Sequence, residues 1–296
     1  MELKIEYLTK DFKRMRAVDQ VTFSFHEGVY GLLGKNGAGK TTFMRMLTTL
    51  IKPTSGNITW NGEDIFQMDA RYRKLLGYLP QDFGAYPDFS LRDYLTYIAL
   101  LKGISPAVAK KRVQAVLPLV GLQDSQQKKM KTLSGGMLRR AGIAQAILNA
   151  PKILILDEPT AGLDPSERIR FRNIISELAK DRIVLLSTHI VSDVSSIADQ
   201  ILLMKDGRFL VSGTVSELAT STPIHAWTCL CEPRQAHYLE KNYVVANMRA
   251  VSAGTEVRVL SNKKPMAGAI LEELTLEDIF LSYMGESAGE ANNGSL

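Results

Sequence analysis

A glycine-rich segment between two apolar runs is the feature that most constrains this chain. It matches the spacing G-x-x-x-x-G-K-[ST] from Gly34 to Thr41, after an apolar run at residues 29–33 and before a helix-like run at residues 42–47. Glycines let successive backbone N–H groups surround an anion, and a helix N-terminus adds partial positive charge. This strand–loop–helix pattern predicts a site for a nucleoside triphosphate.

Within this loop, residue chemistry suggests individual roles. We expect the Lys40 ammonium to reach the β- and γ-phosphates and the Thr41 hydroxyl to coordinate Mg²⁺. The expected nucleotide contacts are Gly34, Asn36, Gly37, Ala38, Gly39, Lys40, Thr41 and Thr42.

Two carboxylates follow a second apolar run. Residues 153–156 are all aliphatic, and Asp157 and Glu158 come directly after them. Such a run is typical of a central parallel strand, and open α/β sheets bind ligands at the carboxyl ends of their strands. We expect Asp157 to hold Mg²⁺ and Glu158 to orient or deprotonate a water molecule. An acidic pair here can also be a solvated loop start, but the phosphate loop favours the metal-binding interpretation.

A third element identifies a family. Ser134-Gly135-Gly136-Met137 precedes a helical pattern, with Ser134 suited to the N-cap. In order with the other two elements, it resembles the signature motif of ATP-binding-cassette ATPases, which usually ends in Gln. Met137 departs from that form, and a thioether cannot reproduce the hydrogen bonds of an amide. Methionine here resembles the cassettes of exporters that have a separate permease subunit.

Other motifs of the same family follow in the expected order. The resemblance implies that Gln81 touches Mg²⁺ and water, that His189 is the switch histidine, and that Phe12 stacks on adenine. It also implies that two cassettes pair head to tail, with Ser134 of one facing the γ-phosphate held by Lys40 of the other. The residues implied to complete the nucleotide contacts are Ser134, Gly135, Gly136 and Asp164.

Composition adds mild constraints. Of 296 residues, 36 are Lys or Arg and 31 are Asp or Glu, a formal net charge of +5 that makes no case for nucleic-acid binding. No stretch approaches 18 consecutive apolar residues, and the first residues contain no apolar secretory segment. We therefore expect a cytoplasmic protein, peripheral on the inner face of the membrane, whose membrane path belongs to another chain.

The predicted fold is α/β: a P-loop nucleotide-binding core with an antiparallel β layer, a helical insertion and a small C-terminal α+β unit. The expected domains are an ATPase domain at 1–220 with a helical subdomain at 82–145, an accessory domain at 221–285, and a disordered tail at 286–296. Expected strands of the first domain lie near 3–8, 21–25, 57–60, 153–157 and 183–187, with helices near 91–101, 106–121 and 191–198.

The C-terminal segment has its own pattern. We expect strands at 227–231, 244–248 and 256–260, and helices at 234–240 and 276–284. Residues 227, 229 and 231 alternate on one face of a strand, which favours buried cysteines. Zinc is the alternative for Cys229 and Cys231 with His225 and His237, but their spacing matches no usual zinc motif.

The leading hypothesis is an ATP-hydrolysing subunit that powers an exporter through a separately encoded membrane permease. Its partners would be that permease and a second cassette, identical or different. The alternatives are a soluble cassette ATPase with an assembly or regulatory role, and a module that uses ATP only to dimerise. Glu158 argues against the last of these, since adhesion alone needs no such carboxylate.

Overall fold

A computed structural model describes residues 1–285 of the chain. The tail predicted at 286–296 lies outside the described residues. The chain divides into two compact units, Met1–Phe209 and a second that begins at Leu210. This division falls earlier in the chain than the domain boundary that we expect after residue 220. The expected domain boundary stays a prediction. The two units are described separately below.

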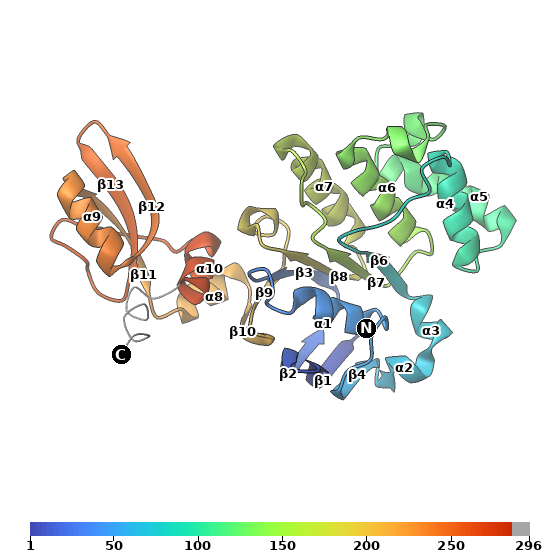
Figure 1. Cartoon of the computed structure of the whole chain (residues 1–296), viewed down its shortest axis with the longest axis horizontal. Helices are drawn as coiled ribbons and strands as arrows, with labels where there is room; N and C mark the ends of the chain where they lie inside the picture. The colour runs from blue at the N-terminus through green and yellow to red at the C-terminus, as the bar shows by residue number, and fades with distance from the viewer. Residues whose placement is uncertain (286–296) are drawn as a thin grey trace. The chain divides into compact units, whose positions relative to one another are not determined.

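Five strands of a six-stranded sheet form the centre of the first unit, and the sixth, an edge strand, begins at its end (Figure 1). The pairs that join its four inner strands and its β6 edge are parallel, as expected of an open α/β core. Every residue of the two strands that carry the predicted acidic and switch motifs is buried. The strand order is β10 (Arg208–Gly213), β9 (Gln200–Lys205), β3 (Gly28–Leu33), β8 (Ile183–Thr188), β7 (Ile153–Asp157) and β6 (Leu76–Leu79).

An antiparallel sheet packs on the other side of helix α1 (Lys40–Leu47) and confirms the predicted β layer (Figure 1). Phe25 from this layer and Phe43 from α1 belong to one buried cluster. The turn at Asn61-Gly62 has positive φ at both residues, 49° and 87°, as a two-residue hairpin requires. The strands, in spatial order, are β2 (Met15–Phe25), β1 (Leu3–Phe12), β4 (Ser55–Trp60) and β5 (Glu63–Asp64).

The helical insertion is also confirmed. Ser90 caps its first helix by accepting a hydrogen bond from the Asp93 N–H, and Pro106 occupies the first position of the next. The helices of the first unit beyond α1 are α2 (Ile65–Met68), α3 (Ala70–Arg73), α4 (Leu91–Leu101), α5 (Pro106–Leu119), α6 (Gly135–Ile147) and α7 (Pro165–Leu178). Short 3₁₀ turns are η1 (Gln123–Ser125), η2 (Met130–Thr132) and η3 (Val191–Asp193).

The helix predicted at 191–198 is wrong. Only the 3₁₀ turn η3 forms there, and turns follow it. Two β-branched valines and three serines give this segment weak helix propensity, and serine hydroxyls compete for backbone groups, as the Ser195 Oγ does by donating to the Ser192 carbonyl. Asp193 is buried here and bonds to a residue of another loop, which fixes the irregular path.

The second unit is a four-stranded antiparallel sheet with helices, as expected. Cys229 and Cys231 are buried, and Trp227 packs against the same apolar cluster, which confirms that these three positions share one face. The fourth strand of this sheet, the edge strand β14 that pairs with β11, was not predicted. The elements are α8 (Val215–Ser221), β11 (His225–Cys231), α9 (Pro233–Asn242), β12 (Val244–Val251), β13 (Gly254–Ser261), β14 (Ile270–Glu272) and α10 (Leu276–Met284), with sheet order β12-β13-β11-β14.

No helix within residues 1–285 combines the length and apolar character that crossing a bilayer requires.

Candidate nucleotide site

The glycine-rich segment forms the loop between β3 and α1, as predicted. Gly37 and Gly39 have φ of 85° and 104°, a region that favours glycine. A Cβ at Gly39 would overlap the carbonyl oxygen of Ala17, and one at Gly34 would overlap that of Met204. The loop therefore needs glycine at these two positions for its path against the neighbouring backbone.

Lys40 begins α1 and is buried, with 6% of its surface exposed. Its Nζ donates to the Gly34 carbonyl at 2.7 Å and lies 3.4 Å from Oε1 of Glu158. A buried ammonium needs such partners because its charge is costly away from water. The side chain thus folds over its own loop, in position to meet an anion there.

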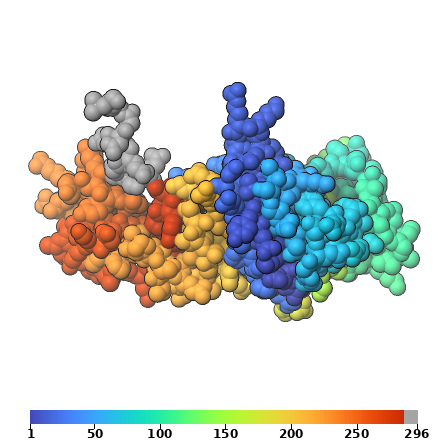
Figure 2. Space-filling model, turned by 90° about the horizontal axis from the view of Figure 1, so that it is seen from below, coloured from blue at the N-terminus to red at the C-terminus, as the bar shows by residue number. Residues whose placement is uncertain are grey.

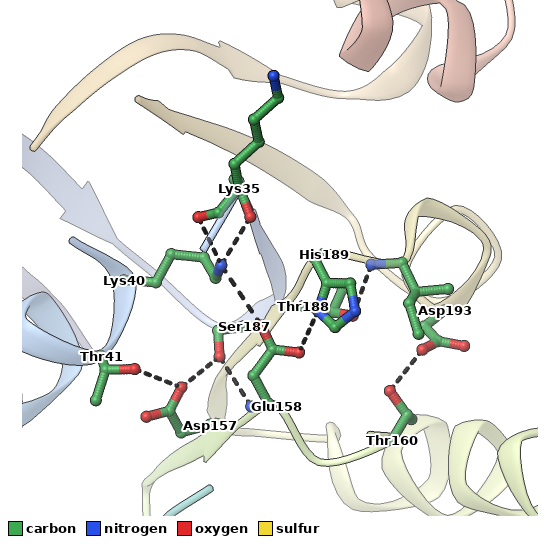
Figure 3. Close-up of polar contacts among 12 residues, drawn as sticks. Lys35, Lys40, Thr41, Asp157, Glu158, Thr160, Ser187, Thr188, His189 and Asp193 are labelled. Atoms are coloured by element: carbon green, nitrogen blue, oxygen red, sulfur yellow. Dashed lines mark hydrogen bonds and ion pairs between the residues drawn. The ribbon is translucent and has the colours of Figure 1, made fainter. Parts of the chain in front are cut away.

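Asp157 lies at the end of β7, fully buried, beside the start of α1 (Figure 3). Its Oδ1 accepts hydrogen bonds from the hydroxyls of Thr41, at 3.3 Å, and Ser187, at 2.7 Å. Its Oδ2 has no hydrogen-bond partner within the described part of the chain. A buried carboxylate oxygen without a partner is unusual and suits a cation.

The Asp157 carboxylate also affects its neighbour Tyr78 on β6. Burial, and after it the negative charge of Asp157, raise the pKa of the Tyr78 phenol. The negative charge at the end of β7 therefore acts on a side chain of the neighbouring strand β6.

Glu158 follows directly and is held on three sides (Figure 3). Its N–H donates to the Ser187 Oγ at 2.9 Å, its Oε1 faces Lys40, and its Oε2 lies 3.0 Å from Nδ1 of His189. Its φ is 46°, an uncommon value for a residue with a side chain. The ends of β7 and β8 thus bring Glu158 and His189 together, although 31 residues separate them.

Ser187 is a site residue that the sequence analysis did not single out. Its hydroxyl donates to Asp157 and accepts from the Glu158 N–H, so it links the two carboxylates. The pairing of Asp157 with Ser187 in the β7–β8 register places it there. Its position two residues before His189, at the end of an apolar strand, was the available signal.

Gln81 and Phe12 stand apart from this cluster. The Gln81 carbonyl accepts a hydrogen bond from Nη1 of Arg139, and its side chain is exposed. Phe12 is 42% exposed, with Nζ of Lys10 at 5.2 Å from its ring centroid. It ends β1, beside the turn to β2. In Figure 2, dark blue residues near the N-terminus stand out beyond the upper edge of the molecule. Roles for both residues stay predictions.

The signature residues begin α6. Ser134 caps the helix, as predicted, by accepting from the Met137 N–H at 3.2 Å. A Cβ at Gly135 would meet nothing within 4 Å, so this turn presents an open backbone. Gly135 also lines a pocket of about 320 Å³ together with Gln81 and Gly162.

Asp164 caps α7, accepting from the Glu167 N–H at 2.9 Å. That hydrogen bond, with a second from the Ser166 hydroxyl, lowers the pKa of Asp164. Across residues 1–285, no hydrogen bond or ion pair joins Ser134 or Asp164 to the cluster around Lys40. The chain therefore assembles two separate groups of predicted site residues.

Sequence comparison with known proteins supports the family resemblance that the motifs indicated. The model of the ABC transporter family matches residues 18–161. The uncharacterised ABC transporter ATP-binding protein YxlF of Bacillus subtilis is 39% identical over 82% of this chain and 82% of its own length. The bacitracin transport ATP-binding protein BcrA of Bacillus licheniformis is 39% identical over 70% of this chain and 68% of its own. The Nod factor export ATP-binding protein I of Ralstonia nicotianae is 35% identical over 74% and 68%.

A solved structure supports the same family resemblance. CbiO1 of Clostridium perfringens, described as part of an ABC transporter complex, superimposes with a TM-score of 0.68 at 28% identity, over 74% of this chain and 90% of that one. This chain belongs to the family of ABC transporter ATP-binding proteins. The resemblance inferred from the motifs is thereby confirmed, and with it the P-loop α/β fold and the binding of ATP.

Proposed function

We propose that this chain is the ATP-hydrolysing subunit of an exporter and works with a separate integral-membrane permease at the inner face of the cell membrane. The observation that carries the enzymatic part is the buried Glu158 carboxylate, held between Lys40 and His189. The transport and export names of the relatives favour this role over a soluble, non-transport cassette ATPase.

In the proposed site, each contact of the cluster has a role. Lys40 and the loop N–H groups bind the β- and γ-phosphates, and the Glu158 carboxylate accepts the proton of the attacking water. His189, at 3.0 Å from Glu158, orients that carboxylate and contacts the γ-phosphate. When Lys40 meets a phosphate instead of Glu158, the carboxylate is released toward the water.

The residues present fit Mg²⁺. The Thr41 hydroxyl and the Asp157 carboxylate are hard oxygen ligands that lie close together. The hydroxyl donates to Oδ1 at 3.3 Å, and Oδ2 has no hydrogen-bond partner among residues 1–285. Bound there, the ion would neutralise charge on the phosphates. The exposed Gln81 side chain would be a further ligand of the ion.

The second group of residues indicates a composite site. Ser134 and Asp164 make no hydrogen bond or ion pair to the Lys40 cluster within residues 1–285, yet Ser134 presents an open, glycine-rich helix N-terminus suited to an anion. We propose that this turn completes the site of a second cassette, identical or different, when ATP lies between them.

An exposed aromatic group on the helical insertion is proposed to contact the permease. The rings of Tyr86 and Phe89 stack with centroids 5.2 Å apart, and both side chains are exposed. Tyr86 also lines a pocket of about 500 Å³ with Tyr94 and Tyr97. Large exposed aromatic side chains beside a hollow are characteristic of docking sites.

The test of the composite site is Ser134→Arg. This variant should bind ATP as the wild type does and lose hydrolysis, because the long side chain enters the facing cassette's site. Ser216→Arg, which adds the same charge at an exposed position of α8, is the matched control and should hydrolyse ATP normally. Normal hydrolysis by Ser134→Arg would exclude a two-cassette site.

For the permease, the full chain is purified from the membrane fraction of its source cells. Wild type should co-purify with an integral-membrane protein that Tyr86→Ala and Phe89→Ala variants retain poorly, while their basal ATP hydrolysis is unchanged. Equal recovery of membrane proteins by all three would remove these aromatic residues from the interface.

A further inference from the structure

Beyond the nucleotide cluster, two loops are joined by a buried polar contact. The Thr160 hydroxyl donates to Oδ2 of Asp193, and these residues are 1% and 2% exposed (Figure 3). Burying a carboxylate is costly unless it is paired and hydrogen-bonded. A pair of apolar side chains would fill the same space without that cost, so the contact calls for a role beyond packing.

The two residues sit on the loops that carry Glu158 and His189. Thr160 comes two residues after Glu158, and Asp193 four residues after His189. Both loops leave the sheet at the neighbouring ends of β7 and β8. The Thr160–Asp193 bond therefore ties together, on the far side from Lys40, the same two segments that the Glu158–His189 contact joins.

A third residue extends this link to α7. Nη1 of Arg168 lies 3.8 Å from Oδ1 of Asp193, and its Nε donates to the Leu163 carbonyl at 3.1 Å. The Arg168 N–H also donates to the Asp164 carbonyl at 3.0 Å. One side chain thus contacts both the buried carboxylate and the turn that begins α7.

We propose that Thr160, Asp193 and Arg168 are positioning residues that hold His189 against Glu158 and transmit to this pair the position of the start of α7. This inference rests on the proposed function, in which Glu158 and His189 act on the γ-phosphate and Asp164 lies near the second cassette. None of the three touches the nucleotide. They act through the loops that they join.

The hydrogen bond and the packing of Thr160 can be separated by two substitutions. Thr160→Val keeps the size of the side chain but removes the hydroxyl, whereas Thr160→Ser keeps the hydroxyl but removes a methyl group. If the hydrogen bond positions the pair, the valine variant should lose turnover and the serine variant should keep it. If packing alone matters, the order reverses.

For the full chain with Mg²⁺ and ATP, we expect Thr160→Val to lower kcat by about 10- to 100-fold, the scale for a misplaced catalytic group. KM and the Kd for ATP should stay within about twofold of wild type, because binding depends on the phosphate loop. Thr160→Ser should keep kcat within about threefold. Arg172→Met is the control: it loses a hydrogen bond from α7 to the Ser192 carbonyl but leaves the Asp193 carboxylate with both of its contacts, so it should behave as wild type.

Circular dichroism and the unfolding midpoint establish that each variant is folded, and Arg168→Met supplies a second variant that leaves the Thr160 bond in place. It should lower kcat in the same direction as Thr160→Val, with Kd unchanged. Wild-type kcat in Thr160→Val, or equal losses in the valine and serine variants, would overturn the proposal. So would parallel loss of kcat and ATP affinity.

The proposed function fails in a different way. If Glu158→Gln hydrolyses ATP normally, the assignment of Glu158 is wrong whatever Thr160 does. If Glu158→Gln is inactive and Thr160→Val is fully active, only the positioning inference fails.

Discussion

Replacing Ser187 by alanine removes one hydroxyl that serves two buried partners. Its Oγ donates to Asp157 at 2.7 Å and accepts from the Glu158 N–H at 2.9 Å. Both partners and Ser187 itself are buried, so water cannot readily replace the hydroxyl. Among residues 1–285, Asp157 keeps the longer bond from Thr41, at 3.3 Å, and the Glu158 N–H loses the acceptor that the Ser187 hydroxyl provides.

The magnitude follows from those two losses. A buried N–H without an acceptor costs about 1 to 3 kcal/mol, and a hydrogen bond to a charged carboxylate contributes about 1.5 to 3 kcal/mol. Local relaxation offsets part of the sum, which leaves an expected loss of about 2 to 4 kcal/mol in the free energy of unfolding of the first unit. ATP turnover should fall as well, because Glu158 is no longer held in its uncommon backbone conformation at φ 46°.

The assay is urea unfolding followed by circular dichroism without nucleotide, together with steady-state ATP hydrolysis. Ser195→Ala is the matched control, since Ser195 is exposed and its hydroxyl donates to the Ser192 carbonyl at a long 3.4 Å. The control should change the unfolding free energy by less than about 0.5 kcal/mol. If Ser187→Ala matches the control in both measurements, the linking role of Ser187 is refuted.

Three further predictions concern other residues. Lys40→Ala should abolish ATP binding in a titration calorimeter, because the loop loses the charge that faces the phosphates; retained micromolar binding would contradict this. Phe12→Ala should weaken ATP binding by about 1 to 3 kcal/mol if its exposed ring stacks on adenine, and should change the ATP-to-GTP preference little; an unchanged Kd would assign Phe12 to another role. Burial lowers the pKa of Lys102 from 10.5 to about 8, so between these values the unfolded chain binds more protons and stability rises with pH. Relative to Lys102→Met, wild type should gain about 2 to 3 kcal/mol of unfolding free energy across that window, and parallel pH profiles would refute the depressed pKa.

Much of the site could be predicted because its residues are close in sequence. The loop that ends at Lys40 and Thr41, and the pair Asp157 and Glu158, have their chemistry and spacing fixed within a few positions. The caps at Ser90 and Ser134 were predictable for the same reason, since a cap depends on residues three positions away.

Contacts that depend on strand register were harder to predict. The contact of His189 with Glu158 and the double role of Ser187 were not predicted, because both depend on how β7 pairs with β8. The family resemblance implied only that His189 is the switch histidine. Asp193, which accepts the hydrogen bond from Thr160, lies in the segment where a helix was wrongly predicted. In that segment a long-range polar contact fixes the backbone, and the local spacing of apolar residues did not indicate this contact.

The most direct test of the account is the turnover of Glu158→Gln, measured with ATP binding and molar mass by light scattering. The substitution keeps the shape of the side chain and removes its capacity to accept a proton. The account predicts intact ATP binding, turnover lowered by about 10²- to 10⁴-fold, and accumulation of an ATP-bound dimer. Turnover near the wild-type rate in this variant would contradict the claim that Glu158 is the catalytic base of this ATPase.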